Sequence, residues 1–232
     1  MLARILEPEV MDSAEEARDY DSMDHSTVNR AFVEDLLQAA ANAGLFLSLA
    51  GAPSAAATEM LDLGTGTALI PVELCRRNRG VQVVAIDLAE EMLKLGRANV
   101  DRAGMQTRIR LERVDGKRLP YADGSFAAVI SNSIVHHIPE PRSVLAEALR
   151  VVRRGGLVFV RDLLRPADDA TVGYLVETYA AGANERQRAL FDASLRAALS
   201  LEEIRMLVET LECPSATVQA TSDRHWTWSM RK

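Results

Sequence analysis

The spacing of apolar residues along the chain changes near residue 58. Before that point, an acidic stretch at 12–24 leads into apolar residues that recur at helical spacing: Phe32, Val33, Leu36, Leu37 and Ala40. We therefore expect residues 1–50 to form an N-terminal helical cap or lid. Small residues at 50–54 form a loop between this cap and a region where strand, turn and helix patterns follow in repeating order.

Five short apolar segments in that region are predicted as strands: 59–63, 81–86, 109–114, 126–130 and 157–160. Helical patterns occupy 69–77, 89–103 and 142–152, and Gly155-Gly156 is predicted as the turn that leads into the fifth strand. Repeated strand and helix units of this kind indicate a parallel sheet with helices on both faces, because each parallel connection needs a crossover.

The alternation stops after residue 164. Residues 168–199 are predicted as two helices joined near Gly182, which we interpret as a helical insertion at 165–199. Ser200 and Glu203 form a capping box that opens a last helix, and 216–221 with 224–229 are predicted as a C-terminal hairpin. The sequence thus predicts one α/β domain over 1–232 with a seven-stranded, mostly parallel sheet, a core at 58–164, and the last helix and hairpin at 200–232.

Candidate chemistry gathers where the predicted strands end. The first strand runs into the turn Asp62-Leu63-Gly64-Thr65-Gly66-Thr67, which exposes backbone N–H groups and lets a ligand approach the main chain closely. Asp87 ends the second strand, where it can accept hydrogen bonds from ribose hydroxyls or cap the next helix. Asp115 and Gly116 follow the third strand, where the carboxylate can accept from an adenine amino group or stabilise a turn.

These three features converge on one edge of a parallel sheet, because the carboxyl ends of its strands meet there. A glycine turn alone also occurs as a purely structural element, but three such features at successive strand ends indicate a nucleoside-sized site. Thr67 and Leu69 stand where a dinucleotide site needs a third glycine for close helix packing. The pattern therefore argues against a dinucleotide ligand.

Residues 58–164 resemble the class I S-adenosylmethionine-dependent methyltransferases, especially the small-molecule enzymes of the methyltransferase type 11 group that includes ubiquinone and sterol methyltransferase relatives. The segments that carry the resemblance are 61–67, 84–88, 115–116, 119–126, 131–138 and 149–160. The resemblance implies a Rossmann-like fold, S-adenosylmethionine as cofactor, S-adenosylhomocysteine as product, and transfer of a methyl group to a small-molecule acceptor by in-line displacement.

The resemblance also implies which residues bind the cofactor. The methionine portion would be held by the turn, and the ribose by Asp87. The adenine would lie near Leu88 and Met92, with its amino group on Asp115-Gly116, and Ser131 or Asn132 would line the edge where the methyl group is transferred. The complete set of cofactor residues is Asp62, Leu63, Gly64, Thr65, Gly66, Asp87, Leu88, Met92, Asp115, Gly116, Ser131 and Asn132.

Two histidines follow the fourth strand, close to the expected methyl donor. Methyl transfer from a sulfonium needs positioning above all, and a base only if the acceptor must lose a proton. Histidine titrates in the useful range, so His137 is the leading catalytic candidate, with His136 and Asn132 as further ones. In the family that the chain resembles, paired histidines are common after the fourth strand in enzymes with different substrates. At least one of the two is therefore expected to have a structural role.

The acceptor pocket is expected to form from the N-terminal segment, the end of the fifth strand and the insertion. Tyr20 and His25 are candidates on the first, and Arg161 and Arg165 near the second, because charges at the end of a central strand are costly to bury unless they are paired or used. Aromatic residues elsewhere are interpreted mainly as packing, with two tryptophans sealing the sheet against a helix: Tyr174, Tyr179, Trp226 and Trp228.

Composition narrows the range of partners. The formal net charge is -6, so nucleic acid is not expected, and the basic clusters at 76–79 and 150–154 are interpreted as helix ends. Cys75 and Cys213 lack metal-ligand spacing, and we expect no disulfide and no metal site. No apolar run reaches the roughly 20 residues of a membrane span, so a cytoplasmic protein is expected.

Two other functions are compatible with such a chain. An RNA or protein methyltransferase would be expected to carry a basic appended domain or prolines after the fourth strand, which Ser131-Asn132-Ser133 lacks. A noncatalytic partner protein that binds the cofactor remains the alternative outside the enzymes, because a fold does not establish an activity. The acceptor and the oligomeric state are left open by the sequence.

Overall fold

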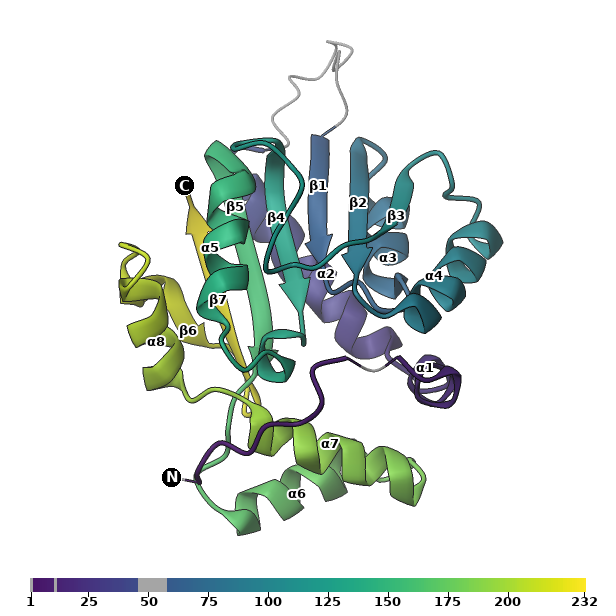
Figure 1. The fold of residues 1–232 in the computed structure, drawn as a ribbon, viewed down its shortest axis with the longest axis vertical. Coiled ribbons are helices and arrows are strands. Elements are labelled where there is room, and N and C mark those ends of the chain that lie inside the picture. Colours follow the sequence, from purple (N-terminus) through teal and green to yellow (C-terminus); the bar gives the residue numbers. More distant parts are fainter. Residues whose placement is uncertain (1, 11, 46–57) are drawn as a thin grey trace.

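One sheet of seven strands forms the centre of the structure, a computed structural model that describes residues 2–10, 12–45 and 58–232 (Figure 1). In spatial order the strands are β3 (Ile109–Arg113), β2 (Val81–Asp87), β1 (Thr58–Leu63), β4 (Phe126–Asn132), β5 (Val152–Leu163), β7 (His225–Arg231) and β6 (Val218–Ala220). Among these strands β7 runs antiparallel to both of its neighbours, β5 and β6, and the pairings between the other strands are parallel. The Rossmann-like, mostly parallel sheet predicted from the sequence is confirmed, while the predicted loop at 50–54 lies outside the described residues.

Helices cover both faces of the sheet, as predicted. Apolar side chains of α2 (Ser26–Asn42), α3 (Leu69–Arg77) and α4 (Glu90–Arg102) pack on one face. The other face is covered by α5 (Arg142–Val151) and α8 (Leu201–Glu209). Central strands are buried on both sides, which explains why Met60, Leu61 and Leu63 form a nearly continuous apolar run. No helix in the described part of the chain is long and apolar enough to cross a membrane.

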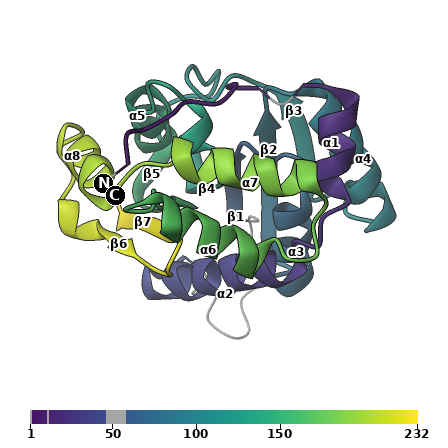
Figure 2. The ribbon, with the colours of Figure 1, turned by 90° about the horizontal axis from the view of Figure 1, so that it is seen from below.

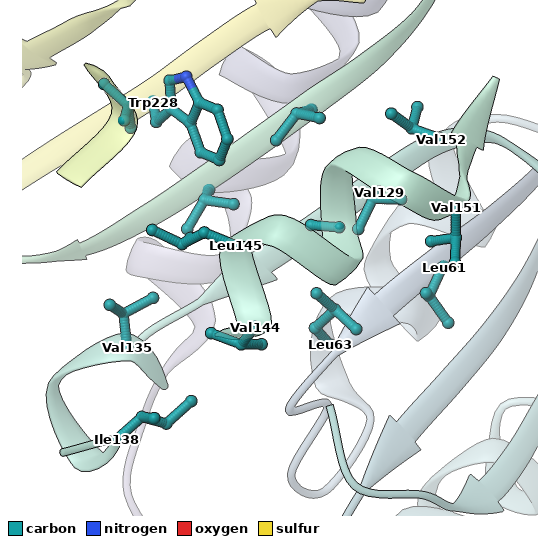
Figure 3. Close-up of a cluster of buried hydrophobic side chains, with 14 of the residues drawn as sticks. Leu61, Leu63, Val129, Val135, Ile138, Val144, Leu145, Val151, Val152 and Trp228 are labelled. Atoms are coloured by element: carbon teal, nitrogen blue, oxygen red, sulfur yellow. The ribbon is translucent and has the colours of Figure 1, made fainter. Parts of the chain in front are cut away.

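The two tryptophans of β7 occupy the predicted place. Trp226 and Trp228 are fully buried, and both belong to the cluster that α5 and α8 complete. Figure 3 shows Trp228 on the same side of the sheet as Leu145 of α5. His225 and Thr227 alternate with them and face the opposite side, in keeping with the two-residue period of a strand. The tryptophans therefore seal the sheet beneath its helices.

The fifth strand begins five residues earlier than predicted, and Gly155-Gly156 is not a turn before it. Both glycines lie inside β5, at a register irregularity between Phe126 and Ala128 of the neighbouring strand. Gly155 has a φ of +75°, and a Cβ on Gly156 would lie 2.6 Å from the carbonyl oxygen of Ala127. The glycines thus allow a bulge inside the strand, a role that glycine also has in sheets.

The carboxyl ends of the parallel strands are covered by segments from opposite ends of the sequence. Figure 2 shows the N-terminal segment, α1 (Ala14–Asp21), α6 (Asp169–Tyr179) and α7 (Glu185–Ala197) crossing this edge. Arg4 Nε donates to the carbonyl of Ala197 at 2.7 Å, and Gln187 Nε2 donates to that of Asp19 at 3.2 Å. The N-terminal lid and the helical insertion are confirmed. However, α2 belongs to the layer on the sheet face and is not part of the lid.

Replacing Trp226 with Ala should lower the free energy of unfolding by about 3–5 kcal/mol, because it removes a fully buried aromatic side chain that no neighbour can replace. Urea denaturation followed by circular dichroism measures this change. Met206→Ala on the exposed side of α8 is the matched control, with an expected change within about 0.5 kcal/mol. Equal losses in the two variants would contradict this account of the core.

Candidate functional site

The glycine turn after β1 has a backbone that other residues would strain. Gly64 and Gly66 have φ values of +68° and +54°. A Cβ on Gly64 would lie 2.1 Å from Ile134 Cγ2, so this position requires glycine for its conformation and for space. The N–H of Thr65 donates to the carbonyl of Ile86 at 2.8 Å, which fixes the turn beside the end of β2.

Asp87 joins the turn to the next helix. Its Oδ2 accepts from the Gly66 N–H at 2.8 Å and its Oδ1 accepts from the Ala89 N–H at 2.9 Å. Burial raises the pKa of Asp87, and these backbone N–H groups partly oppose the shift. Carboxylate oxygens can accept further bonds beyond these. Asp87 is not the N-cap of α4, since Ala89 takes that position and the helix has no side-chain cap; the carboxylate fixes the approach to the helix and can still accept from a ligand.

Most of the predicted cofactor residues line two adjoining cavities at the strand ends. The larger cavity is lined by Gly64, Gly66, Asp87, Leu88, Met92, Asp115, Gly116 and Asn132. The smaller is lined by Asp62, Gly64, Thr65 and Asn132. Leu63 and Ser131 line neither cavity, because the Leu63 side chain lies in the core and Ser131 Oγ donates to the Leu63 carbonyl at 2.8 Å. Of Ser131 and Asn132, the two residues considered for the transfer edge, Asn132 is the one that lines these cavities.

Asp115 lies in a tight turn of its own. Its Oδ1 accepts from the Lys117 N–H at 2.9 Å, while Lys117 Nζ pairs with Glu9 of the N-terminal segment. Glu9 and Val10 also line the larger cavity. The N-terminal segment therefore closes the side of the cavity on which Asp115 lies.

Polar groups without partners concentrate around the smaller cavity. Within the described residues, buried atoms that lack a hydrogen bond include four from its wall: Asp62 Oδ2, Thr65 Oγ1, Thr67 Oγ1 and Asn132 Oδ1. Burial raises the pKa of Asp62 to about 7, and repulsion by Asp87 adds to the shift. Unpaired buried polar atoms are costly, so this group suits a ligand that brings hydrogen-bond donors, such as an ammonium group.

Tyr20 covers the junction of the two cavities, since it lines both. Its ring stacks on His25 at 4.5 Å between ring centres, and His25 Nε2 lies 2.9 Å from the Tyr20 carbonyl oxygen. Burial, together with Asp87 and Asp62, raises the pKa of Tyr20 to about 12. The phenol is therefore a neutral hydrogen-bond donor at neutral pH, and His25 supports it without lining either cavity.

His136 is buried behind the cavity wall. Its Nδ1 lies 2.6 Å from Asp162 Oδ1 and its Nε2 lies 3.3 Å from Glu7 Oε1. Burial disfavours its charged form, but Asp162 and Glu7 outweigh that effect and raise the pKa of His136. Burial alone would raise the pKa of Asp162, but His136 and backbone N–H groups hold it below its ordinary value. His136 thus belongs to a buried polar group and does not reach the cavities.

His137 differs from its neighbour because it lines the larger cavity. Its Nδ1 lies 3.2 Å from Glu7 Oε1 and 3.4 Å from the Pro8 carbonyl oxygen. Burial, reinforced by the charge of His136, lowers the pKa of His137 to about 4. The imidazole is therefore neutral at neutral pH.

Arg161 and Arg165 do not lie where the sequence analysis expected the acceptor. Arg161 pairs with Asp35 at 2.7 Å and donates to Thr227 Oγ1 at 2.9 Å. Arg165 pairs with Glu203, and neither arginine lines the described cavities. The partners, Asp35 and Glu203, are far from these arginines in sequence. The sequence therefore indicated no partner for the buried charges, and a ligand was expected instead. The structure corrects that prediction, because these arginines are paired within the protein.

The tyrosines of the insertion also lie outside the two cavities. Tyr179 donates to Asp223 at 2.6 Å with Arg224 over its ring, and Tyr174 is exposed on α6. Sequence reasoning missed Glu7 altogether. This residue lies 129 positions before His136 and stands in no motif, and the only signal was that acidic residues occur early in the chain.

Comparison with known proteins agrees with this geometry. Residues 61–160 match the family model of the methyltransferase domain. The match covers less than half of the chain, and this part is similar to a methyltransferase domain. The ubiquinone biosynthesis O-methyltransferase of Xanthomonas axonopodis is 33% identical over 110 residues, which cover 47% of this chain and 45% of that protein. The phosphatidylethanolamine N-methyltransferase of Cereibacter sphaeroides is 34% identical over 101 residues, 44% of this chain and 48% of that protein.

The matches to these relatives span less than half of each relative's length. Similarity of fold extends further. A solved S-adenosylmethionine-dependent methyltransferase structure from Methanococcus maripaludis, described as putative, aligns with a TM-score of 0.64 and 15% identity. That alignment covers 98% of this chain and 97% of the other. The similarity in sequence to these relatives is thus confined to part of the chain, whereas the whole described fold is known from a solved structure.

Gly64→Ala should lower the free energy of unfolding by about 2–4 kcal/mol, because alanine is strained at this φ and its Cβ would overlap Ile134. Gly182→Ala, in the α6–α7 connection where an added Cβ meets nothing within 4 Å, is the control and should change little. Denaturant titration of both variants measures the difference. Similar stabilities would show that the turn tolerates a side chain.

Proposed function

We propose that this protein is an S-adenosylmethionine-dependent methyltransferase that acts on a small-molecule acceptor. The observation that carries the proposal is the row of carboxylates at three successive strand ends. Asp62 lies among unpartnered polar atoms, Asp87 lies at the next strand end, and Asp115 follows the third. Such a row suits a nucleoside whose other end carries an ammonium group. The methyltransferase domain at 61–160 and its relatives support the same reading.

The wall of each cavity suggests how the donor would be held. Asp62, Thr65 and the N–H groups of the turn would bind the amino-acid end, and Asp87 the ribose hydroxyls. Leu88 and Met92 offer apolar contacts to the adenine, with Asp115 as acceptor for its amino group. When bound, the donor supplies an electrophilic methyl group for in-line displacement and leaves as S-adenosylhomocysteine.

Residues at the junction of the cavities would serve the transfer itself. Tyr20 covers the junction, and Asn132 Oδ1 is a buried acceptor without a partner. These side chains can orient the reacting groups and exclude water, which accounts for much of the rate in such displacements. His137 is neutral and lines the same cavity, so it is the candidate to take a proton from an acceptor hydroxyl, although a pKa of about 4 makes it a weaker base than an ordinary histidine.

The class of acceptor is proposed from the relatives, one of which is named an O-methyltransferase and the other an N-methyltransferase. A cofactor-binding protein without activity would bind the donor equally well, so only turnover distinguishes the two. An RNA or protein acceptor would instead be revealed by labelling of macromolecules. The cytoplasmic location and the absence of a nucleic-acid partner stay predictions from the sequence.

Asp62→Asn should abolish measurable binding of S-adenosylmethionine and yet stabilise the free protein at pH 7.5 by roughly 1–3 kcal/mol. The carboxylate attracts the donor's ammonium group but is costly to bury when ionised. Calorimetry with the donor and thermal unfolding of the free protein measure the two effects. Asp101→Asn on the exposed side of α4 is the control and should change neither quantity.

The same carboxyl predicts a pH dependence. Its pKa is about 7 in the folded protein and near 3.8 ordinarily, so between these values the folded state binds a proton that the unfolded chain does not. The contribution of Asp62 to stability is therefore present below pH 4 and is lost as the pH rises to about 7. In Asp62→Asn this dependence should be weaker. Equal pH dependence in wild type and variant would contradict the assignment.

His137→Gln should leave the affinity for S-adenosylmethionine nearly unchanged but lower turnover by roughly 10²–10⁴-fold if the acceptor must lose a proton. The acceptor is first found by incubating metabolite pools with a donor labelled in its methyl group. Unchanged turnover with intact donor binding would remove His137 from the mechanism. Labelled product with the wild-type enzyme would also exclude the noncatalytic alternative.

A further inference from the structure

Three side chains from distant parts of the sequence meet beside the larger cavity, and His137 is the one of them that lines it. Glu7 comes from the N-terminal segment, and His136 and His137 from the short helix after β4 (Val135–His137). One ligand atom from each lies within 4.8 Å of the other two. We propose that Glu7, His136 and His137 form a binding site for one divalent transition-metal ion, of the class that Zn²⁺ and Co²⁺ represent.

The distances between the ligand atoms fit such an ion. Glu7 Oε1 lies 3.3 Å from His136 Nε2 and 3.2 Å from His137 Nδ1. In a tetrahedral site with bonds of about 2.0–2.1 Å, neighbouring ligand atoms are about 3.3–3.4 Å apart. Glu7 Oε1 thus lies at this spacing from both imidazoles, and the two imidazole nitrogens lie within 4.8 Å of each other. Two imidazoles and one carboxylate form a ligand set that leaves at least one position open.

The groups behind the ligands also match those of metal centres. Metal-bound histidines usually donate their second ring N–H to a carboxylate, which fixes the ring and its tautomer. His136 Nδ1 lies 2.6 Å from Asp162 Oδ1, and Asp162 also accepts from backbone N–H groups of Val135 and Leu163. Ser194 Oγ donates to Glu7 Oε1 at 3.1 Å. His136 is thus held on its far side, and Glu7 is held by Ser194 at the carboxylate itself.

The charges around the three ligands favour a dication. Glu7 and Asp162 are two carboxylates buried close together, and a divalent ion between them balances both. Arg4 is the nearby cation, but its guanidinium donates to the carbonyl oxygens of His136, Ile138 and Pro139 instead of to either carboxylate. A proton on His136 is the competing arrangement, in which Glu7 serves only as an ionic latch for the N-terminal segment.

The position of the ligands suggests what the ion would do, and this part rests on the proposed methyl transfer. His137 lines the cavity that Asn132 also lines, so an open position of the ion would face the acceptor. A bound cation lowers the pKa of a coordinated hydroxyl. With its Nδ1 on the ion, His137 would keep a proton on Nε2, and the ion would then activate the acceptor in place of the imidazole.

Metal titration of the complete chain, prepared without a histidine tag and stripped with a chelator, tests the proposal. Zn²⁺ is followed by calorimetry, and Co²⁺ by its visible absorption, whose strength reports four- or five-coordinate binding. We expect one ion per chain in the wild type and an affinity at least about 10-fold lower in Glu7→Gln, which keeps the shape of the side chain but loses its charge. His137→Gln should weaken binding in the same way.

Two control variants separate this site from general binding to carboxylates and imidazoles. Glu9→Gln changes a neighbouring carboxylate on the same segment, and His225→Gln changes a buried imidazole outside the cluster. Both should bind the ions as the wild type does. Absence of binding, or equal affinity in wild type, Glu7→Gln and His137→Gln, would overturn the proposal and leave Glu7 as a latch. Since donor binding is measured without metal, the two proposals can fail separately.

Discussion

The hydrogen bonds of one carboxylate, Asp87, hold the binding edge of this protein together. Asp87 lies at the end of β2, and its two oxygens accept from Gly66 in the turn after β1 and from Ala89 at the start of α4. Two connections that approach the sheet edge from different strands are thereby fixed relative to each other. Gly64 and Gly66 adopt positive φ values readily because glycine has no Cβ, and this carboxylate and the Thr65 bond to Ile86 hold the turn in place. The cavities on both sides of Tyr20 depend on that arrangement.

Charge pairing divides the polar residues of this edge into two groups. Arg161 and Arg165 are buried, and their charges are balanced within the protein by Asp35 and Glu203. Asp62 is buried without such a partner, and its pKa rises to about 7 as a result. A buried charged group without a partner, such as Asp62, therefore indicates a ligand site better than the presence of buried charges alone. The same criterion separates a neutral His137, which faces the cavity, from His136, which lies between two carboxylates.

The features that the sequence predicted are those that short segments determine. The strands follow from the spacing of apolar residues, and the glycine turn and the polar residues at the strand ends follow from local chemistry. The structure places the turn and these polar residues at one edge of the sheet. The errors concern contacts over long distances in sequence. Arg161 could not be assigned to Asp35, 126 residues away, and Glu7 could not be assigned to the histidines, because no local pattern encodes either pairing. Gly155-Gly156 was misread because a bulge inside a strand and a turn before it use the same residues.

The residues proposed to bind the methyl donor and those proposed to bind the acceptor come from different parts of the fold. Asp62, Asp87 and Asp115 lie within residues 61–160, which match the methyltransferase domain model. Glu7 and Tyr20 come from the N-terminal part, and α6 and α7 follow β5. The covering segments also bind one another, through the bonds of Arg4 to Ala197 and of Gln187 to Asp19, and connecting segments vary more readily than the elements that they connect. Donor binding is thus tied to the sheet, and acceptor choice to the covering segments. A substitution at Glu7 or Tyr20 should therefore alter acceptor chemistry in ways that the shared core does not specify.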